Sequence, residues 1–167
     1  MNPSPPHDLI VFGATSFVGQ ILARHLFEQF GTHGKLNWAA AGRSIARLEE
    51  LRASIGPAAA KLPLLVADAA DEAALSKMCL GTKAVVSTVG PYAMYGEPLV
   101  KVCAETGTDY CDLTGEAQWI RRMLSQYEET ARKSGARIVH SCGFDSIPSD
   151  LGVLFLQQEA IRRFGQP

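Results

Sequence analysis

Short apolar runs alternate with longer amphipathic segments along this chain. The first run, residues 9–12, is continuously apolar and ends at Gly13, which is typical of a strand buried on both faces. Five more runs predict strands, at 36–41, 62–66, 84–88, 108–112 and 137–141. Apolar residues recur at helical spacing between these runs, at 18–31, 45–55, 97–106 and 116–134. Helix N-caps are expected at Ser44 and Asp71, and at Ser149 or, alternatively, Ser146.

Strands that alternate with helices are joined by right-handed crossovers, which place helices on both faces of a parallel sheet. We therefore expect an α/β fold of the Rossmann type, a doubly wound sheet of six strands in the order 3-2-1-4-5-6. No repeat or interior linker divides the sequence. Residues 1–167 are thus expected to form a single dinucleotide-binding domain, with a flexible N-terminus at residues 1–7.

The sequence GATSFVG, at 13–19, joins the first strand to the first helix. Gly13 permits a tight turn and Gly19 lets the helix pack close to the sheet, while the helix start offers N–H groups to a pyrophosphate. Ser16 replaces the middle glycine of a GxxGxxG loop. Its Cβ narrows the approach to the backbone, whereas its hydroxyl is able to donate to a phosphate, and both outcomes stay open. The expected cofactor-binding residues are Gly13, Thr15, Ser16, Phe17, Val18 and Gly19.

The end of the second strand distinguishes the two nicotinamide dinucleotides. An acidic residue there binds the ribose 2′-OH of NAD, but no acidic residue stands between Ala39 and Glu49. Arg43 is suited to a 2′-phosphate, with Ser44 or Arg47 assisting, and the alternative is a solvated arginine before a helix. We therefore expect NADP(H) to be preferred over NAD(H).

Residues after the third and fourth strands complete the expected site. Asp68 is placed either to contact the adenine or to cap a helix. Thr88, Gly90 and Pro91 lie near the expected ribose and nicotinamide, or else form a simple turn. Tyr92 is expected to pack nearby.

Charge and motif content exclude several other functions. Sixteen basic and 17 acidic residues give a net charge of −1, which argues against nucleic acid and membrane surfaces as partners. No secretory signal or membrane-spanning stretch is found, so we expect a cytoplasmic protein. The four cysteines lack metal-binding spacing, so they are interpreted as reduced thiols, and no metal site is expected. No tyrosine has a lysine four residues later, and no P-loop, HExxH or GxSxG motif is present, so catalytic residues stay unknown.

Five segments occur in a familiar order: GATSFVG at 13–19, AGRS at 41–44, TVGPY at 88–92, YCDLTGE at 110–116 and GFDSIPSD at 143–150. Together they resemble the NAD(P)-binding domain of saccharopine dehydrogenase-like oxidoreductases, close to the trans-acting enoyl reductase branch. The resemblance covers almost the whole chain. It implies a second domain that helps to form the substrate site, which these 167 residues lack, and it identifies the chain as an N-terminal portion.

The last two segments contain acidic residues that have two interpretations. Asp112 and Glu116 flank the turn after the fifth strand, while Asp145 and Asp150 flank the turn after the sixth. These turns are expected on the nicotinamide side of the sheet, yet acidic residues also stabilise helix N-termini. Cys142 is interpreted as a buried thiol rather than a nucleophile, because no partner base is identifiable.

The resemblance implies an NADP(H)-dependent oxidoreductase that transfers a hydride to or from an unidentified small-molecule or lipid-type substrate. The portion present here is expected to lack full activity. The alternative is a non-catalytic NADP(H)-sensing or interaction module, which the missing Tyr/Lys pair favours. An exposed apolar face in place of the second domain is expected to drive homodimerisation.

Overall fold

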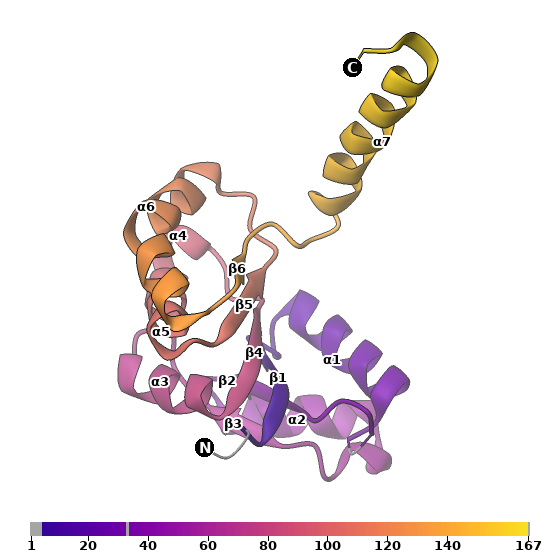
Figure 1. Cartoon of the computed structure of the whole chain (residues 1–167). Coiled ribbons are helices and arrows are strands. Elements are labelled where there is room, and N and C mark those ends of the chain that lie inside the picture. Colours follow the sequence, from indigo (N-terminus) through magenta and orange to yellow (C-terminus); the bar gives the residue numbers. More distant parts are fainter. Residues whose placement is uncertain (1–4, 33, 167) are drawn as a thin grey trace.

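A wholly parallel six-stranded sheet stands at the centre of the computed structural model, which describes residues 5–32 and 34–166 (Figure 1). The strand order is β3-β2-β1-β4-β5-β6, so the expected order is confirmed. The strands are β1 (His7–Phe12), β2 (Trp38–Gly42), β3 (Leu64–Val66), β4 (Thr82–Ser87), β5 (Asp109–Asp112) and β6 (Ile138–Val139).

Helices cover both faces of the sheet. On one face lie α1 (Phe17–Phe30) and α2 (Ile45–Ile55), and on the other lie α3 (Glu72–Leu80), α5 (Glu97–Thr106) and α6 (Ala117–Ser134). Two shorter elements, the 3₁₀ helix η1 (Pro57–Ala59) and α4 (Tyr92–Tyr95), were not expected from the sequence. A last helix, α7 (Ile147–Phe164), follows β6.

Alternation along the central strands divides the core into two layers. In β1, Ile10 and Phe12 pack with α3, α5 and α6, whereas Val11 between them packs with α1 and α2. Continuous apolar runs are therefore required in the central strands, because both of their faces are covered. This explains why the run at 9–12 predicts the first strand correctly.

Local signals in the sequence set most of the helix ends. Ser44 and Asp71 are the N-caps of α2 and α3, and each side chain accepts a hydrogen bond from the third N–H after it. Gly31 ends α1 with a positive φ of 65°. At the chain start, His7 already pairs with Thr82 in the sheet, while residues 1–4 of the expected flexible segment lie outside the described residues.

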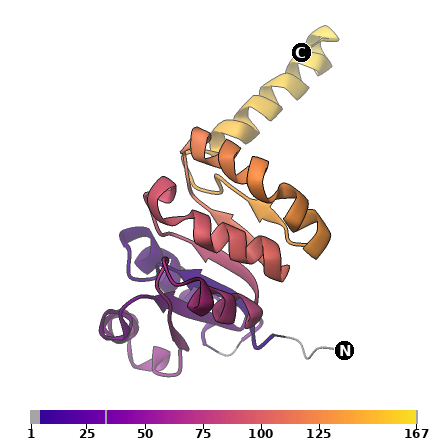
Figure 2. The ribbon, with the colours of Figure 1, turned by 90° about the vertical axis from the view of Figure 1, so that its left-hand side faces the viewer.

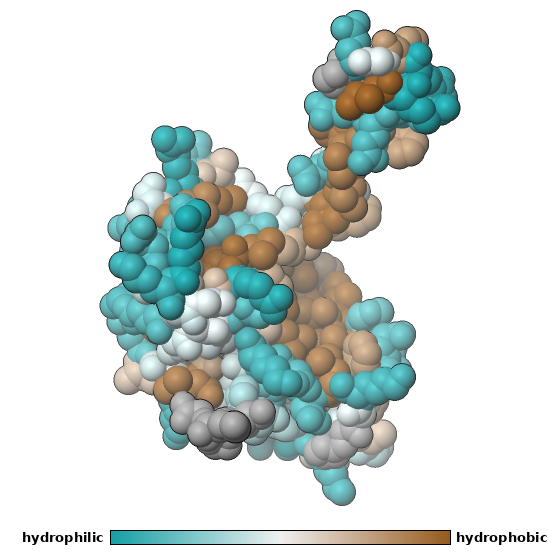
Figure 3. Space-filling model, viewed as in Figure 1, coloured by the Kyte–Doolittle hydropathy of each residue, from teal (hydrophilic) through white to brown (hydrophobic). Residues whose placement is uncertain are grey.

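The last helix lies apart from the two layers. Figures 1 and 2 show α7 extending away from the sheet, and none of its residues is buried. Apolar side chains follow α7 and also gather beside α1 in the space-filling view (Figure 3). Phe155 and Leu156 of α7 are 65% and 67% exposed. None of the helices in the described part of the chain is long and apolar enough to cross a membrane.

Gly19 is required for the close packing of α1, which gives a first prediction. A Cβ at this position would lie 2.2 Å from the carbonyl oxygen of Gly13, so Gly19→Ala forces the backbone to shift. We expect a loss of about 1–3 kcal/mol in the free energy of unfolding, measured by urea denaturation. The matched control is Gly115→Ala, whose Cβ would meet no atom within 4 Å and should change stability by less than about 0.5 kcal/mol. Equal stability of both variants would contradict this account of the packing.

Candidate cofactor-binding site

The sheet order makes the carboxyl ends of β1 and β4 the topological switch point of the sheet. The chain runs outward in opposite directions from these two neighbouring strands, and ligands of doubly wound sheets bind at such a point. Two loops flank it, residues 13–19 after β1 and residues 88–91 after β4. They are joined directly, because the Thr88 hydroxyl donates to the carbonyl oxygen of Gly13 at 2.9 Å.

The loop at 13–19 has the geometry of a phosphate-binding turn. Gly13 has a φ of 84°, a conformation that favours glycine, and an added Cβ would lie 2.7 Å from Val89. Within the described residues, the N–H groups of Thr15, Phe17 and Val18 have no hydrogen-bond acceptor. These donors stand at the positive end of the α1 dipole, which suits an anionic ligand. The side chains of Phe17 and Val18 are 82% and 40% exposed.

Ser16 fits this loop without strain. Its φ of −70° and ψ of 167° are ordinary extended backbone, so the serine in place of a glycine costs no conformational energy. Its Oγ accepts from the N–H of Gly19 at 3.0 Å and lies 3.0 Å from the Thr88 hydroxyl. The Thr88 hydroxyl also lies within hydrogen-bond distance of the carbonyl oxygens of Phe12 and Gly13, and when its single proton is donated to a carbonyl, Ser16 is the donor in the serine–threonine pair. The Ser16 hydroxyl therefore caps α1 and links the two loops.

Residues expected on the adenosine side lie at the ends of β2 and β3. Arg43 is exposed, and no hydrogen bond or ion pair joins its side chain to another described residue. The Ser44 side chain caps α2 by accepting from the N–H of Arg47 at 3.5 Å. Asp68 accepts from the N–H of Ala70 at 2.9 Å, so its carboxylate closes a local turn. Arg43 is thus the cation of this group that is open to a ligand.

The loop at 88–91 follows β4, on the other side of the switch point from β2 and β3. Gly90 and Pro91 are exposed and are joined by a cis peptide bond. A Cβ at Gly90 would make only ordinary contacts with Tyr92, the nearest at 3.6 Å from its ring, so the space beside Gly90 is open. Tyr92 is buried beneath the loop, and its hydroxyl donates to the carbonyl oxygen of Ser87 at 2.9 Å. Burial raises the pKa of Tyr92 to about 12, so this hydroxyl keeps its proton at neutral pH.

Asp112 is the centre of a buried polar network behind this loop. Its side chain is fully buried and accepts from the Tyr110 hydroxyl at 2.9 Å and from the backbone N–H groups of Thr114 and Ser141 at 3.1 and 3.0 Å. The fourth contact is with Nδ1 of His140, at 2.7 Å. Four partners offset the cost of burying a carboxylate. Asp112 therefore joins the loops after β5 and β6.

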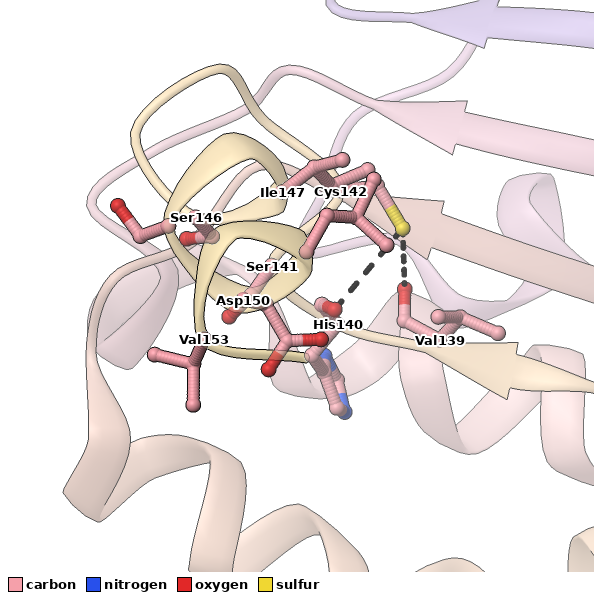
Figure 4. Close-up of a pocket in the computed structure, with 10 residues that line it drawn as sticks. Val139, His140, Ser141, Cys142, Ser146, Ile147, Asp150 and Val153 are labelled. Atoms are coloured by element: carbon pink, nitrogen blue, oxygen red, sulfur yellow. Dashed lines mark hydrogen bonds between the residues drawn. The ribbon is translucent and has the colours of Figure 1, made fainter. Parts of the chain in front are cut away.

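The loop after β6 is held in an unusual conformation by the same network. Ser141 has a φ of 61°, which is uncommon for a residue with a side chain, and its hydroxyl donates to the carbonyl oxygen of Thr114 at 2.8 Å. Next to it, the Cys142 sulfur faces the carbonyl oxygens of Val139 and His140 (Figure 4). Burial, followed by the nearby Asp112 charge, raises the pKa of the Cys142 thiol. A protonated thiol is a poor nucleophile. Cys142 is half-buried, however, so the expectation of a buried thiol is wrong in its burial.

A pocket of about 740 Å³ lies between this loop and the start of α7 (Figure 4). Its lining mixes apolar side chains with hydroxyl, thiol and acidic groups, namely Val139, His140, Ser141, Cys142, Ser146, Ile147, Ser149, Asp150, Leu151 and Val153. Asp145 and Asp150 are exposed here. The N-cap position of α7 is Ser146, the expected alternative to Ser149, although the Ser146 side chain makes no cap hydrogen bond. The Ser149 hydroxyl donates to the carbonyl oxygen of Asp145, so the cap expected at Ser149 is wrong.

The structure brings most of the expected cofactor residues to one edge of the sheet. The loops at 13–19 and 88–91 are in direct contact, whereas Arg43, Ser44 and Asp68 follow the neighbouring strands β2 and β3. The pairing of Asp112 with His140 was not foreseen. The neighbouring positions of β5 and β6 in the expected strand order were the available signal. Among the described residues, no group of three His, Cys, Asp or Glu side chains is placed to hold a metal ion.

Fold and loop geometry together define a Rossmann-type dinucleotide-binding domain. The sequence matches the model of the saccharopine dehydrogenase NADP binding domain over residues 9–139. The chain belongs to this family, and its cofactor is NADP(H).

Relatives and solved structures agree with this assignment. The chain is 46% identical to trans-acting enoyl reductases of Mycobacterium ulcerans and Mycobacterium tuberculosis, over 153 and 154 residues, which are 92% of this chain but 36% of each relative. The chain thus spans about a third of the length of these relatives. Saccharopine dehydrogenase (L-Glu forming) from Saccharomyces cerevisiae shares the fold with a TM-score of 0.74 and 19% identity, over 93% of this chain and 32% of that one. Triphenylmethane reductase from Citrobacter, solved with NADP(H), has a TM-score of 0.57 at 14% identity, over 80% and 48%.

The Asp112 network gives a second prediction. Asp112→Ala leaves His140, Tyr110 and two backbone N–H groups without their acceptor, so we expect a loss of about 3–5 kcal/mol in the free energy of unfolding. Urea denaturation measures it. The control is Asp109→Ala on the same strand, which removes a largely exposed pair with Arg137 and should cost about 1 kcal/mol. Similar losses of unfolding free energy in the two variants would show that the buried network stabilises the fold no more than the Asp109–Arg137 pair does.

Proposed function

We propose that this chain is the NADP(H)-binding domain of an oxidoreductase that transfers a hydride between the cofactor and a small-molecule or lipid-type substrate. The pair of loops at 13–19 and 88–91 carries the proposal, because the free N–H groups of the first loop and the place of both at the switch point suit a dinucleotide. The relatives named trans-acting enoyl reductase support reduction of a carbon–carbon double bond as the reaction class. NADP(H) supplies the hydride when it is bound.

Each part of the site has a proposed role. Gly13 and Gly19 shape the turn whose N–H groups at Thr15, Phe17 and Val18 bind the pyrophosphate, while Ser16 fixes the turn from beneath. Arg43, which follows β2, binds the 2′-phosphate through two parallel N–H···O hydrogen bonds of its guanidinium group, and Ser44 lies beside it. Asp68 borders the adenine.

On the nicotinamide side, Thr88, Gly90 and Pro91 form the edge against which the reacting ring lies. Tyr92 and Tyr110 are both buried, and burial raises the pKa of each hydroxyl, so both protons are retained in hydrogen bonds to the protein. The loop at 88–91, with the two buried tyrosines behind it, therefore orients the nicotinamide half of the cofactor and excludes water from it. Hydride transfer needs little more from the domain than such positioning.

The alternative is a non-catalytic module that senses NADP(H). Turnover distinguishes the two: a longer protein with this domain that binds NADPH but oxidises it with no enoyl, carbonyl or imine substrate would favour the sensor. We further propose a cytoplasmic location, which four free cysteines support.

The choice of dinucleotide gives the third prediction. Because Arg43 is the exposed cation after β2, NADPH should bind at least about tenfold more tightly than NADH, a difference of about 1.4 kcal/mol. Arg43→Ala should remove this margin by weakening NADPH alone. The dissociation constants of NADPH and NADH are measured by titrating the chain with each dinucleotide and following nicotinamide fluorescence or heat release. Arg52→Ala, on the exterior of α2, is the matched control and should keep the margin. Equal affinities in the unmutated chain would refute the assignment of Arg43.

The apolar surface of α7 gives the fourth prediction, that the isolated chain forms a homodimer. Several large apolar side chains of this helix are more than half exposed, among them Val153, Phe155 and Leu156. Light scattering after size exclusion should give twice the chain mass, and Leu156→Glu should restore the monomer. Ile45→Glu, on α2, should leave the dimer intact. A monomeric profile for the unmutated chain at every salt concentration would overturn this proposal.

A further inference from the structure

The side chain of Glu116 connects the start of α6 with the start of α4, which lies 24 residues earlier in the sequence. Its two carboxylate oxygens accept separate hydrogen bonds from the N–H groups of Tyr92 and Ala93, at 2.7 and 2.8 Å. These N–H groups belong to the first turn of α4. Glu116 is itself the residue that precedes α6, yet its side chain makes no cap bond to that helix. The carboxylate is therefore directed entirely at the segment that follows the loop at 88–91.

This contact fastens one end of the loop at 88–91. The other end is fastened at Thr88, whose N–H donates to the carbonyl oxygen of Phe12 at 2.9 Å and whose hydroxyl donates to Gly13. Between these two anchors, Gly90 and Pro91 are exposed. The position of Gly90 and Pro91 thus depends on where the backbone of Tyr92 is held.

Packing from α6 reinforces the same anchor. The Trp119 ring lies 5.5 Å from the ring of Tyr92, and a Cβ at Gly96 would come within 2.7 Å of Trp119. The turn from α4 into α5 is therefore seated directly against the start of α6. Trp119 supplies contact area, whereas Glu116 supplies two charge-assisted hydrogen bonds with defined direction. The carboxylate determines the orientation of the peptide groups that follow Pro91.

We propose that Glu116 is a positioning residue for the nicotinamide half of the cofactor, acting through the loop at 88–91. This inference rests on the proposed function, because it requires the dinucleotide to lie along that loop. The adenosine half lies over β2 and β3 in the same arrangement, far along the sheet edge from Glu116. Loss of the carboxylate should therefore weaken binding of the nicotinamide half and leave the adenosine half unaffected.

Two ligands separate these halves in one experiment. NADPH contains both, while adenosine 2′,5′-bisphosphate contains the 2′-phosphate and adenosine but no nicotinamide. For Glu116→Ala we expect the Kd of NADPH to rise about tenfold, since two hydrogen bonds to a charged group are lost. The Kd of adenosine 2′,5′-bisphosphate should stay within about twofold. Glu116→Gln keeps one acceptor oxygen, so its Kd for NADPH should lie between those of the unmutated chain and the alanine variant. It is the variant of choice if the alanine variant does not fold.

The matched control is Glu128→Ala, which removes an exposed carboxylate of the same helix that pairs with Arg132. It should change neither constant. An equal loss for both ligands in the Glu116 variants, or no loss for either, would overturn the positioning role while leaving the proposed function intact. If the unmutated chain binds neither ligand, the proposed function fails and this inference fails with it.

Discussion

The contact of Thr88 with the backbone of Gly13 joins the two halves of the sheet where their chain directions diverge. The first half, β1 to β3, brings the turn at 13–19 and Arg43, and the second half, β4 to β6, brings the loop at 88–91. The paired strands β1 and β4 already hold the two halves together, and this contact extends their connection to the two loops. Gly13 allows it, because a side chain there would occupy the space of the Thr88 hydroxyl, 2.8 Å from an added Cβ. The hydroxyl of Ser16 completes the link from the helix side.

Behind the loop at 88–91, buried polar groups add to the apolar contacts of the core. Asp112 makes four hydrogen bonds, to β5 and to the loops that follow β5 and β6, and Glu116 connects this region to α4. Such groups specify direction as well as proximity, which apolar packing alone does less well. The loop at 88–91 is therefore held by hydrogen bonds, while the turn at 13–19 is held by close backbone packing at Gly13 and Gly19. The two ends of one cofactor would thus be held by different physical means.

The sequence predicts the strand order, the two layers and the phosphate turn because each depends on local pattern. Continuous apolar runs, capping residues such as Ser44 and Asp71, and glycines at a strand end are visible within a few residues. The Asp112–His140 pair and the reach of Glu116 to α4 depend on residues 28 and 24 positions apart, so no local pattern contains them. The cap expected at Ser149 is wrong because α7 begins at Ile147, which puts the N-cap position at Ser146, three residues before Ser149. Four-residue α4 was missed since its span is shorter than one amphipathic repeat.

The central claim is that one dinucleotide lies along the edge formed by the loops at 13–19, 43–44 and 88–91. Backbone amide shifts of the isotope-labelled chain, recorded by NMR as NADPH is added, test it most directly. The account predicts the largest changes at Thr15, Phe17 and Val18, with further changes at Arg43 and Gly90 and none in the middle of α7. Changes confined to the pocket beside α7, with the amides of 13–19 unmoved, would contradict it.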